Sequence, residues 1–170
     1  VKRLSQGAFR ECKNLTNIDE LLEGIEEIGS SAFYQSGVRT VNFPEGLKVI
    51  GSRAFDECEE LRMITLPSTT TSIGSGAFRA CPKLMTSTVN GAELSVEGDI
   101  FVSCPFISSI TIGKDVKTFE CNTLDKAITE LIFEEGSQCT KITGNIFGSK
   151  SSVTEVILPP SLMEIGLSVF

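Results

Sequence analysis

The stretch "IGSRAFDECEELRMITLP", residues 50–67, contains the pattern that decides the fold. A near copy, "SIGSGAFRACPKL", covers residues 72–84, and a third version, "IGSSAFYQSGVRTVNFP", begins at Ile28. A phrase that returns at a fixed period is the sequence signature of a repeat protein, whose units stack along one axis. The period of the phrase, rather than any single motif, therefore predicts the architecture.

Each copy is anchored by the aromatic residue of an "AF" pair or by its equivalent. The anchors follow one another at intervals of 22 to 24 residues: Phe9, Phe33, Phe55, Phe78, Phe101, Leu124, Phe147 and Phe170. A second apolar column lies five residues before the anchors: Leu4, Ile28, Ile50, Ile73, Val96, Phe119, Ile142 and Ile165. This period falls in the range of leucine-rich repeats, about 20–29 residues, and is too short for tetratricopeptide, ankyrin or HEAT units.

The letters of the phrase also predict local structure. Ile64, Thr65 and Leu66 alternate as in a short strand whose apolar side chains face inward, and Pro67 ends that strand. The "IG" pair begins a second extended piece. The serines that follow are predicted to be N-caps of a single helical turn that carries "AF": Ser30, Ser52 and Ser75. One such coil cannot bury its own apolar face, but stacked coils can.

The pattern resembles the BspA-like leucine-rich repeat family. The residues that carry the resemblance are "IGSRAFDECEELRMITLP" (50–67), "SIGSGAFRACPKL" (72–84) and "VTEVILPPSLMEIGLSVF" (153–170), and the phrase is degraded over 86–146. Ordinary leucine-rich repeats place Asn or Cys shortly after the strand, whereas this chain has Pro, Gly113, Asn90 or Glu134 there. The resemblance implies a leucine-rich repeat solenoid, mostly β with short helical turns, in which coils of about 23 residues stack with a parallel sheet on the concave face.

The extent of the repeat predicts one domain over residues 1–170, with about seven to eight coils. The chain lacks a starting Met and stops on an anchor, so we interpret it as a fragment of a longer chain. Terminal coils of a solenoid need polar caps, and the sequence shows no polar capping segment at either end. Self-association through uncapped end coils is therefore one hypothesis for how the ends are covered.

Composition excludes several classes of function. A formal net charge of -7 argues against a nucleic-acid partner, and no apolar run is long enough to insert into a membrane. The chain has no His, so neither a Ser-His-Asp nor a Cys-His site can be built. No metal, phosphate or cofactor motif stands out, and we predict a protein that is not an enzyme and has no cofactor. Acidic clusters such as Glu57, Glu59 and Glu60 lack a calcium loop and are interpreted as a solvated, repulsive surface.

Four of the six cysteines share a column three residues after the anchor: Cys12, Cys58, Cys81 and Cys104. Ser36 occupies the same column, which indicates a buried slot for a small side chain. A disulfide between neighbouring coils remains an alternative, although three consecutive members cannot all pair. Cys121 and Cys139 fall outside the column. They could pair with each other, but their spacing does not require a disulfide.

The variable, outward-facing strand positions are where a partner could bind. By the alternation of the strand they form the candidate protein-binding face: Thr40, Asn42, Met63, Thr65, Thr86, Thr88, Ser109, Thr111, Glu130 and Glu155, with Ile132 and Ile157 in the same frame. Most of them are small and polar, so an exposed sheet without a ligand is the alternative interpretation.

Proteins that look like this chain are mostly bacterial cell-surface or secreted proteins. The resemblance implies a non-enzymatic protein-binding module that adheres to host proteins, to extracellular-matrix proteins or to other cells. Two alternatives remain: a structural spacer that presents another domain, and a carbohydrate-binding accessory. The second alternative would require stacked aromatic rings on the face, and the Phe column already uses most of the 7% aromatic content.

Overall fold

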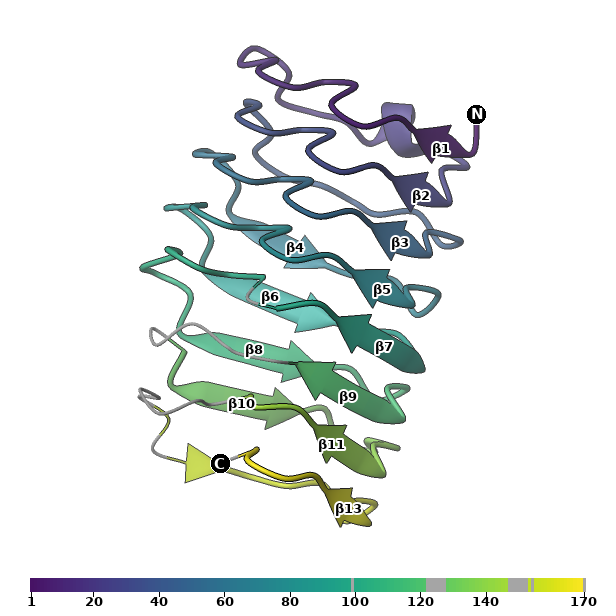
Figure 1. The fold of residues 1–170 in the computed structure, drawn as a ribbon, viewed down its shortest axis with the longest axis vertical. Helices are drawn as coiled ribbons and strands as arrows, with labels where there is room; N and C mark the ends of the chain where they lie inside the picture. Colours follow the sequence, from purple (N-terminus) through teal and green to yellow (C-terminus); the bar gives the residue numbers. More distant parts are fainter. Residues whose placement is uncertain (99, 122–127, 147–152, 154, 170) are drawn as a thin grey trace.

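The computed structural model describes residues 1–98, 100–121, 128–146, 153 and 155–169 of the chain. The chain forms successive coils that stack along one axis, with the N-terminus at one end and the last coil at the other (Figure 1). All paired strands run parallel. From β3 onward, each strand pairs with the second strand after it in the sequence, which belongs to the next coil. The prediction of a leucine-rich repeat solenoid is confirmed.

The "IG" segments form the longer of two sheets, which we call sheet A. It has eight strands in the order β1-β2-β3-β5-β7-β9-β11-β13. Their bounds are Arg3–Leu4, Glu27–Ile28, Val49–Ile50, Ser72–Ile73, Glu93–Val96, Thr118–Cys121, Lys141–Thr143 and Glu164–Ile165. The apolar column that precedes the anchors therefore lies on this sheet, with its side chains facing the core.

The segment "MITLP" and the equivalent segments of the later coils form the shorter sheet, which we call sheet B. It has five strands in the order β12-β10-β8-β6-β4. Their bounds are Glu155–Val156, Glu130–Phe133, Ser109–Ile112, Thr86–Val89 and Met63–Thr65. Ile64 and Ile110 are buried while Met63 and Thr65 are exposed, as the alternation predicts.

Sheet A departs from the predicted column at one place. Val96 pairs with Cys121, and Phe119 pairs instead with Leu94, so the register moves by two residues between β7 and β9. A shift of two keeps the same face of the strand inward. Leu94, Val96, Phe119 and Cys121 are accordingly all buried. A simple period of 23 residues cannot reveal this slip, because the slip preserves burial.

The anchor rings form a stack through the core. Phe9, Phe33, Phe55, Phe78 and Phe101 follow one another with ring centroids 5.4, 5.0, 5.5 and 5.9 Å apart. The planes are inclined by 9° to 22°, so the rings lie nearly parallel. These five anchor rings pack in or against the core; Leu124, Phe147 and Phe170 lie outside the described residues.

The "AF" segments are tight turns and not helical turns, so the predicted N-caps at Ser30, Ser52 and Ser75 are wrong. The described residues contain one helix, the 3-10 helix η1 at Glu20–Leu22. Two residues in the left-handed region flank each of the anchors Phe9, Phe33, Phe55 and Phe78; Arg53 and Glu57, for example, flank Phe55 with φ of 57° each. These residues interrupt a right-handed turn. The amide of Phe55 donates to the carbonyl of Ala77 in the next coil, at 2.7 Å, and not back along its own chain.

The glycines after the apolar column permit close approach of the coils. A Cβ at Gly51 would lie 2.5 Å from the backbone nitrogen of Ser30, and one at Gly74 would lie 2.4 Å from that of Ser52. Gly29 meets the backbone of Leu4 and Ser5 in the same way. The repeated glycine therefore sets the spacing between coils, because any side chain there would push the neighbouring backbone away.

The predicted slot for a small buried residue is confirmed for Cys58, Cys81 and Cys104, all fully buried. Each thiol donates to the carbonyl of the anchor in the preceding coil: Cys58 to Phe33 at 3.2 Å, Cys81 to Phe55 at 3.2 Å and Cys104 to Phe78 at 3.1 Å. Burial raises the pKa of Cys58 to about 11. A thiol held protonated in this way is a poor nucleophile, so the column is structural.

Candidate functional site

The candidate face is the outer side of sheet B, where parallel pairing aligns the predicted residues in two rows. The first row follows the pairs Met63–Thr86, Thr86–Ser109, Ser109–Glu130 and Glu130–Glu155. The second row follows Thr65–Thr88, Thr88–Thr111 and Thr111–Ile132. The strand frame read from the sequence is therefore the register of the sheet.

Thr40 and Asn42 extend these rows beyond β4, although their segment is not a strand in this structure. The side chain of Asn42 donates to the carboxylate of Asp19 at 2.6 Å, and its backbone nitrogen donates to the other oxygen of that carboxylate at 3.0 Å. Asp19 belongs to the coil before, so this contact fixes the first part of the face. For Glu155 the structure describes the backbone alone.

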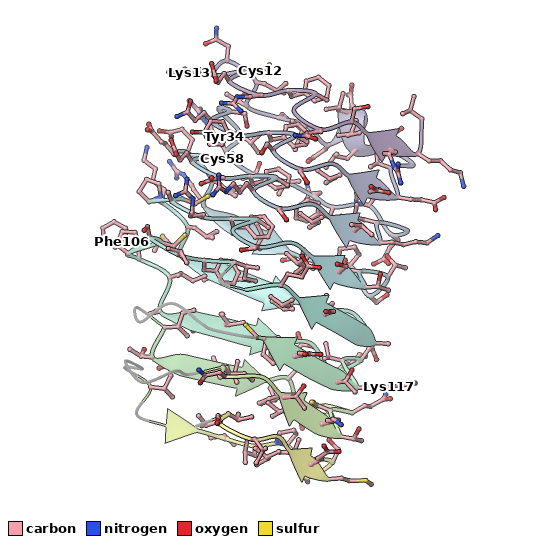
Figure 2. The ribbon with its side chains drawn as sticks, in the orientation of Figure 1. Cys12, Lys13, Tyr34, Cys58, Phe106 and Lys117 are labelled. Carbon is pink, nitrogen blue, oxygen red and sulfur yellow. The ribbon has the colours of Figure 1, made fainter. Side chains whose placement is uncertain are left out.

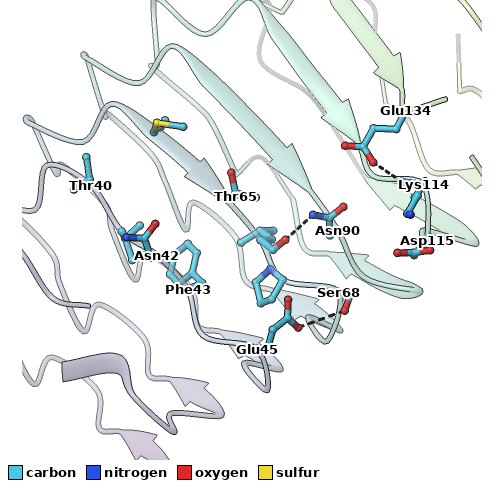
Figure 3. A pocket seen from close by; sticks show the side chains of 14 residues that line it. Thr40, Asn42, Phe43, Glu45, Thr65, Ser68, Asn90, Lys114, Asp115 and Glu134 are labelled. Atoms are coloured by element: carbon cyan, nitrogen blue, oxygen red, sulfur yellow. Dashed lines mark hydrogen bonds between the residues drawn. The ribbon is translucent and has the colours of Figure 1, made fainter. Parts of the chain in front are cut away.

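A hollow of about 690 Å³ lies on this face (Figure 3). Four of the predicted residues line it: Thr40, Asn42, Met63 and Thr65. Its floor is apolar where Val41, Phe43 and Leu66 reach the surface of the core. The other predicted residues lie on strands β6, β8, β10 and β12 beside it and do not line it.

The far edge of the hollow, at the carboxyl ends of the strands, is polar and fixed by hydrogen bonds. Asn90 donates from its amide to the carbonyl of Leu66 at 2.8 Å. Gly113 leaves room for that amide, because a Cβ there would lie 1.4 Å from the Asn90 oxygen. Glu134 accepts from the backbone nitrogen of Lys114 at 2.9 Å, as Figure 3 shows with a dashed line. The edge is therefore already formed in the isolated chain.

This edge carries a surplus of negative charge. Glu45, Asp115 and Glu134 supply three carboxylates, and Lys114 supplies one ammonium group. Glu45 accepts a hydrogen bond from Ser68 at 3.4 Å. Strand alternation in the sequence did not predict these residues. They lie in the turns after the strands, and the composition of these turns differs from coil to coil.

The near edge of the face, where the strands begin, holds residues that the frame also left out. Arg62 donates from its backbone nitrogen to the carbonyl of Arg39 at 3.2 Å, and Met85 donates likewise to Arg62 at 3.0 Å. These residues immediately precede Thr40, Met63 and Thr86, and they are exposed. The sequence did contain a signal for these residues. In three repeats the predicted outward-facing residue is preceded by another polar or flexible residue, Arg or Met.

Some residues of the acidic clusters are paired between coils, and for these the interpretation as a purely repulsive surface does not hold. Buried Asp56 accepts two hydrogen bonds from Arg79, at 2.9 and 2.8 Å. Glu57 accepts from Tyr34 at 3.1 Å and from Gln35 at 2.6 Å. The hydrogen bond from Gln35 is the main cause that lowers the pKa of Glu57. These contacts lie with Tyr34 and Cys58 on the left-hand side of Figure 2, away from the hollow.

The same ladder of charges continues on other parts of the solenoid. Glu60 pairs with Lys83 at 2.5 Å, Arg3 with Glu27 at 2.6 Å and Lys141 with Glu164 at 2.9 Å. Each pair joins neighbouring coils. Several acidic residues that are clustered along the sequence are thus matched with a cation from a neighbouring coil.

The described part of the chain has neither a cluster of metal-ligating side chains nor a membrane-spanning helix. No group of three or more His, Cys, Asp or Glu side chains there is placed to hold a metal ion. Across the same residues, no helix has the length and apolar character needed to cross a bilayer.

At the C-terminal end, apolar side chains are exposed. Met163, Ile165 and Leu167 belong to the last coil, and Ile165 belongs to the column that is buried in every earlier coil. Self-association through this end stays a prediction.

Comparison with known proteins places the chain in a leucine-rich repeat family. A family model described as BspA type leucine rich repeat region, in six copies, matches residues 2–127 and 94–170. A comparison with curated protein sequences found no match.

Two solved structures share the fold over the whole chain. A leucine-rich repeat protein from Bacteroides ovatus is 19% identical with a TM-score of 0.60, and the match covers 100% of this chain and 67% of that one. The leucine-rich repeat protein TpLRR of T. pallidum is 21% identical with a TM-score of 0.63, and the match covers 100% of this chain and 69% of that one. At these identities the likeness concerns the fold alone.

Proposed function

Because this chain belongs to the BspA type leucine-rich repeat family, we propose that it is a non-enzymatic protein-binding module whose partner lies on the outer face of sheet B. Leucine-rich repeat domains generally bind proteins, and stacked coils present an extended surface suited to that task. The observation that carries the proposal is the hollow on this face. It combines an apolar floor with polar edges that hydrogen bonds hold in place.

The size and chemistry of the hollow fit part of a protein surface. Its lining comes from several coils and includes the exposed thioether of Met63 beside the hydroxyls of Thr40 and Thr65. Such a mixture of apolar and polar contacts is typical of transient protein interfaces. The face lacks the stacked aromatic rings that a carbohydrate-binding accessory would need among its described residues.

The biological setting is a further part of the proposal. Family membership supports a place on the cell surface or outside the cell, with adhesion to host proteins, extracellular-matrix proteins or other cells as the activity. A matrix protein is therefore the first partner to test.

The test compares two double variants in surface plasmon resonance against a panel of immobilised extracellular-matrix proteins. Thr65→Arg with Thr88→Arg places two long cations on paired residues of sheet B. The matched control, Ser72→Arg with Ser95→Arg, does the same on paired outward residues of sheet A. We expect the first to weaken binding at least tenfold and the second to leave it within twofold.

Two outcomes would contradict the proposal. Loss of binding in the sheet A variant alone would move the site to the other face. A folded wild-type chain that binds no member of the panel at micromolar concentration would favour the structural spacer, since a spacer needs no partner for its outer faces.

A further inference from the structure

The near edge of sheet B, where its strands begin, forms a surface of its own that we call the basic–apolar rim. It consists of Arg39, Arg62, Met63, Met85 and Phe106. The first four come from three consecutive coils. Backbone hydrogen bonds join Arg62 to Arg39 and Met85 to Arg62, and Met63 pairs with Thr86, the residue after Met85. Phe106 lies in the next coil. Thr86 pairs with Ser109, so Ser108 is the counterpart of Met85, and Phe106 comes two residues before Ser108. Figure 2 shows Phe106 projecting from the left-hand side of the solenoid.

The apolar members of the rim are unusually exposed. Phe106 is 67% exposed, Met85 61% and Met63 51%. No other aromatic side chain of the described residues is as exposed, because the remaining rings lie in the core or are half-buried. Leaving an aromatic ring and two thioethers in water forgoes the favourable free energy of burying their apolar surface. A partner that covers the rim would recover part of it.

The rim is also positively charged, although the chain as a whole carries -7. The rim itself has two cations, Arg39 and Arg62, and no carboxylate, although Glu57, Glu59 and Glu60 line a hollow beside it. Lys83 is already paired with Glu60. Among the described residues, neither Arg39 nor Arg62 has an ion-pair partner within 4 Å, whereas most acidic clusters elsewhere are matched with cations. Two guanidinium groups are therefore left to pair with carboxylates from outside.

The pKa of Glu60 gives independent support for this charge balance. The hydrogen bond from Lys83 is the main cause that lowers it, and the positive charges of Arg39 and Arg62 lower it further. The guanidinium groups thus act on the same part of the surface.

The two ends of the strands of sheet B differ in charge. The rim has its surplus of cations where the strands begin, and the far edge has three carboxylates against the single ammonium of Lys114 where they end. A partner segment that crosses the face along the strands meets positive charge first and negative charge last. Opposite charges at the two edges favour one orientation of that segment over the reverse.

We infer that the basic–apolar rim binds an acidic segment of a partner protein that carries at least one large apolar side chain, and that this segment continues from the rim into the hollow. The inference rests on the proposed function, because it names the chemistry of the partner at the same face. Arg pairs with two carboxylate oxygens at once, and Met and aromatic residues are enriched in the centre of protein interfaces. The rim supplies both kinds of contact within one patch.

The test begins with a selection. Random 12-residue peptides displayed on phage are selected on the immobilised wild-type chain, and the most enriched peptide is synthesised with a fluorescent label. We expect enrichment of Asp and Glu together with Leu, Phe or Trp. Binding by fluorescence polarisation should weaken as NaCl is raised from 50 to 500 mM, because salt screens exposed charges.

Variants then locate the peptide. Arg39→Glu with Arg62→Glu, and separately Met85→Ser with Phe106→Ser, should each reduce its affinity at least tenfold. The controls match each change elsewhere: Lys117→Glu reverses an exposed cation, and Leu167→Ser removes an exposed apolar side chain. Figure 2 places Lys117 on the side opposite Phe106. Both controls should stay within twofold of wild type.

Several results would overturn the inference. Selected peptides that are basic or uncharged would do so, as would rim variants that bind the acidic peptide like wild type. Binding of vesicles with 30% anionic lipid through the rim, without any enriched peptide, would assign the rim to a membrane surface. If matrix binding is lost in Thr65→Arg with Thr88→Arg but kept in both rim variants, the proposed function stands and the rim inference fails.

Discussion

The N-terminal coils and the central coils of this solenoid are held together by different contacts. In the first coils the strands of sheet A are two residues long, and stacked rings, buried thiols and close-set glycines join one coil to the next. In the central coils, β6 to β10 are four residues each, and the described ring stack ends at Phe101. Where the repeated phrase is faithful, side chains bridge the coils; where it degrades, longer backbone pairing takes over.

The largest effect should come from breaking the ring stack. Phe55→Ala removes a fully buried ring that stacks on Phe33 and Phe78 and meets the edge of Phe43 at 5.6 Å. Truncation of a buried Phe costs about 3–5 kcal/mol, because apolar burial is lost and a cavity remains. Guanidinium chloride unfolding followed by circular dichroism measures this loss.

The matched control is Phe106→Ala, which removes an exposed ring of the same size. It should change the free energy of unfolding by less than about 0.5 kcal/mol. Equal destabilisation by the two variants would mean that the stack does not hold the N-terminal coils together.

The contrast between the two halves also explains what the sequence could predict. The period of the anchors gives the solenoid, the ring stack and the register of sheet B, because each depends on a side chain that repeats. The pairing of Phe119 with Leu94 could not be predicted, since a slip of two residues leaves every inward position apolar. The turns around Phe55 were also hidden, because their amides bond to the next coil, which a local capping argument does not consider.

The second effect concerns the glycine that sets the coil spacing. Gly51→Ala places a Cβ 2.5 Å from the backbone nitrogen of Ser30, so the backbone of one coil has to move. We expect a loss of about 1–3 kcal/mol, as for other overpacked sites. The control, Glu97→Ala, changes the residue at the same place in a central coil and should cost less than about 0.5 kcal/mol. A Gly51→Ala variant with wild-type stability in thermal unfolding would show that the coils can separate freely there.

A third variant should strengthen the central coils. Ser87 is 3% exposed and lies in β6 between Ile64 and Ile110, and its hydroxyl has no partner among the described residues. Ser87→Val removes an unpaired polar group and adds apolar contact, which should raise the free energy of unfolding by about 1 kcal/mol. Ser109→Val, on the outer face of the next strand, controls for β-propensity. If urea unfolding shows destabilisation by Ser87→Val, the slot is too small for a second methyl group.

The candidate face was predictable only in part, for a similar reason. Thr40, Met63 and Thr65 follow from strand alternation, because outward positions of a strand can be counted. Arg62 and Phe106 lie at corners and in turns, where exposure depends on how neighbouring coils align. The number of residues in one coil does not determine that alignment.

The smallest effect should come from the charges that join the first coils at the surface of sheet A. Glu26 accepts hydrogen bonds from Lys2 and from Lys48, the latter at 2.8 Å, and thereby connects three coils. The hydrogen bond from Lys2 is the main cause that lowers the pKa of Glu26 from 4.5 to about 2. Since the folded-state pKa is depressed, the stabilisation is fully present above about pH 4.5 and is lost as the pH falls through about 2.

Glu26→Gln tests this linkage through melting temperatures measured from pH 7 to pH 2. The wild type should melt slightly higher at pH 7, and the difference should shrink as the carboxylate of the wild type is protonated. The group is exposed, so 1 M NaCl should remove most of the difference at pH 7 as well. A difference that stays constant down to pH 2, or that salt leaves unchanged, would mean that Glu26 acts through packing of its side chain and not through its charge. In that case the charge of Glu26 would contribute nothing to the cohesion of the N-terminal coils.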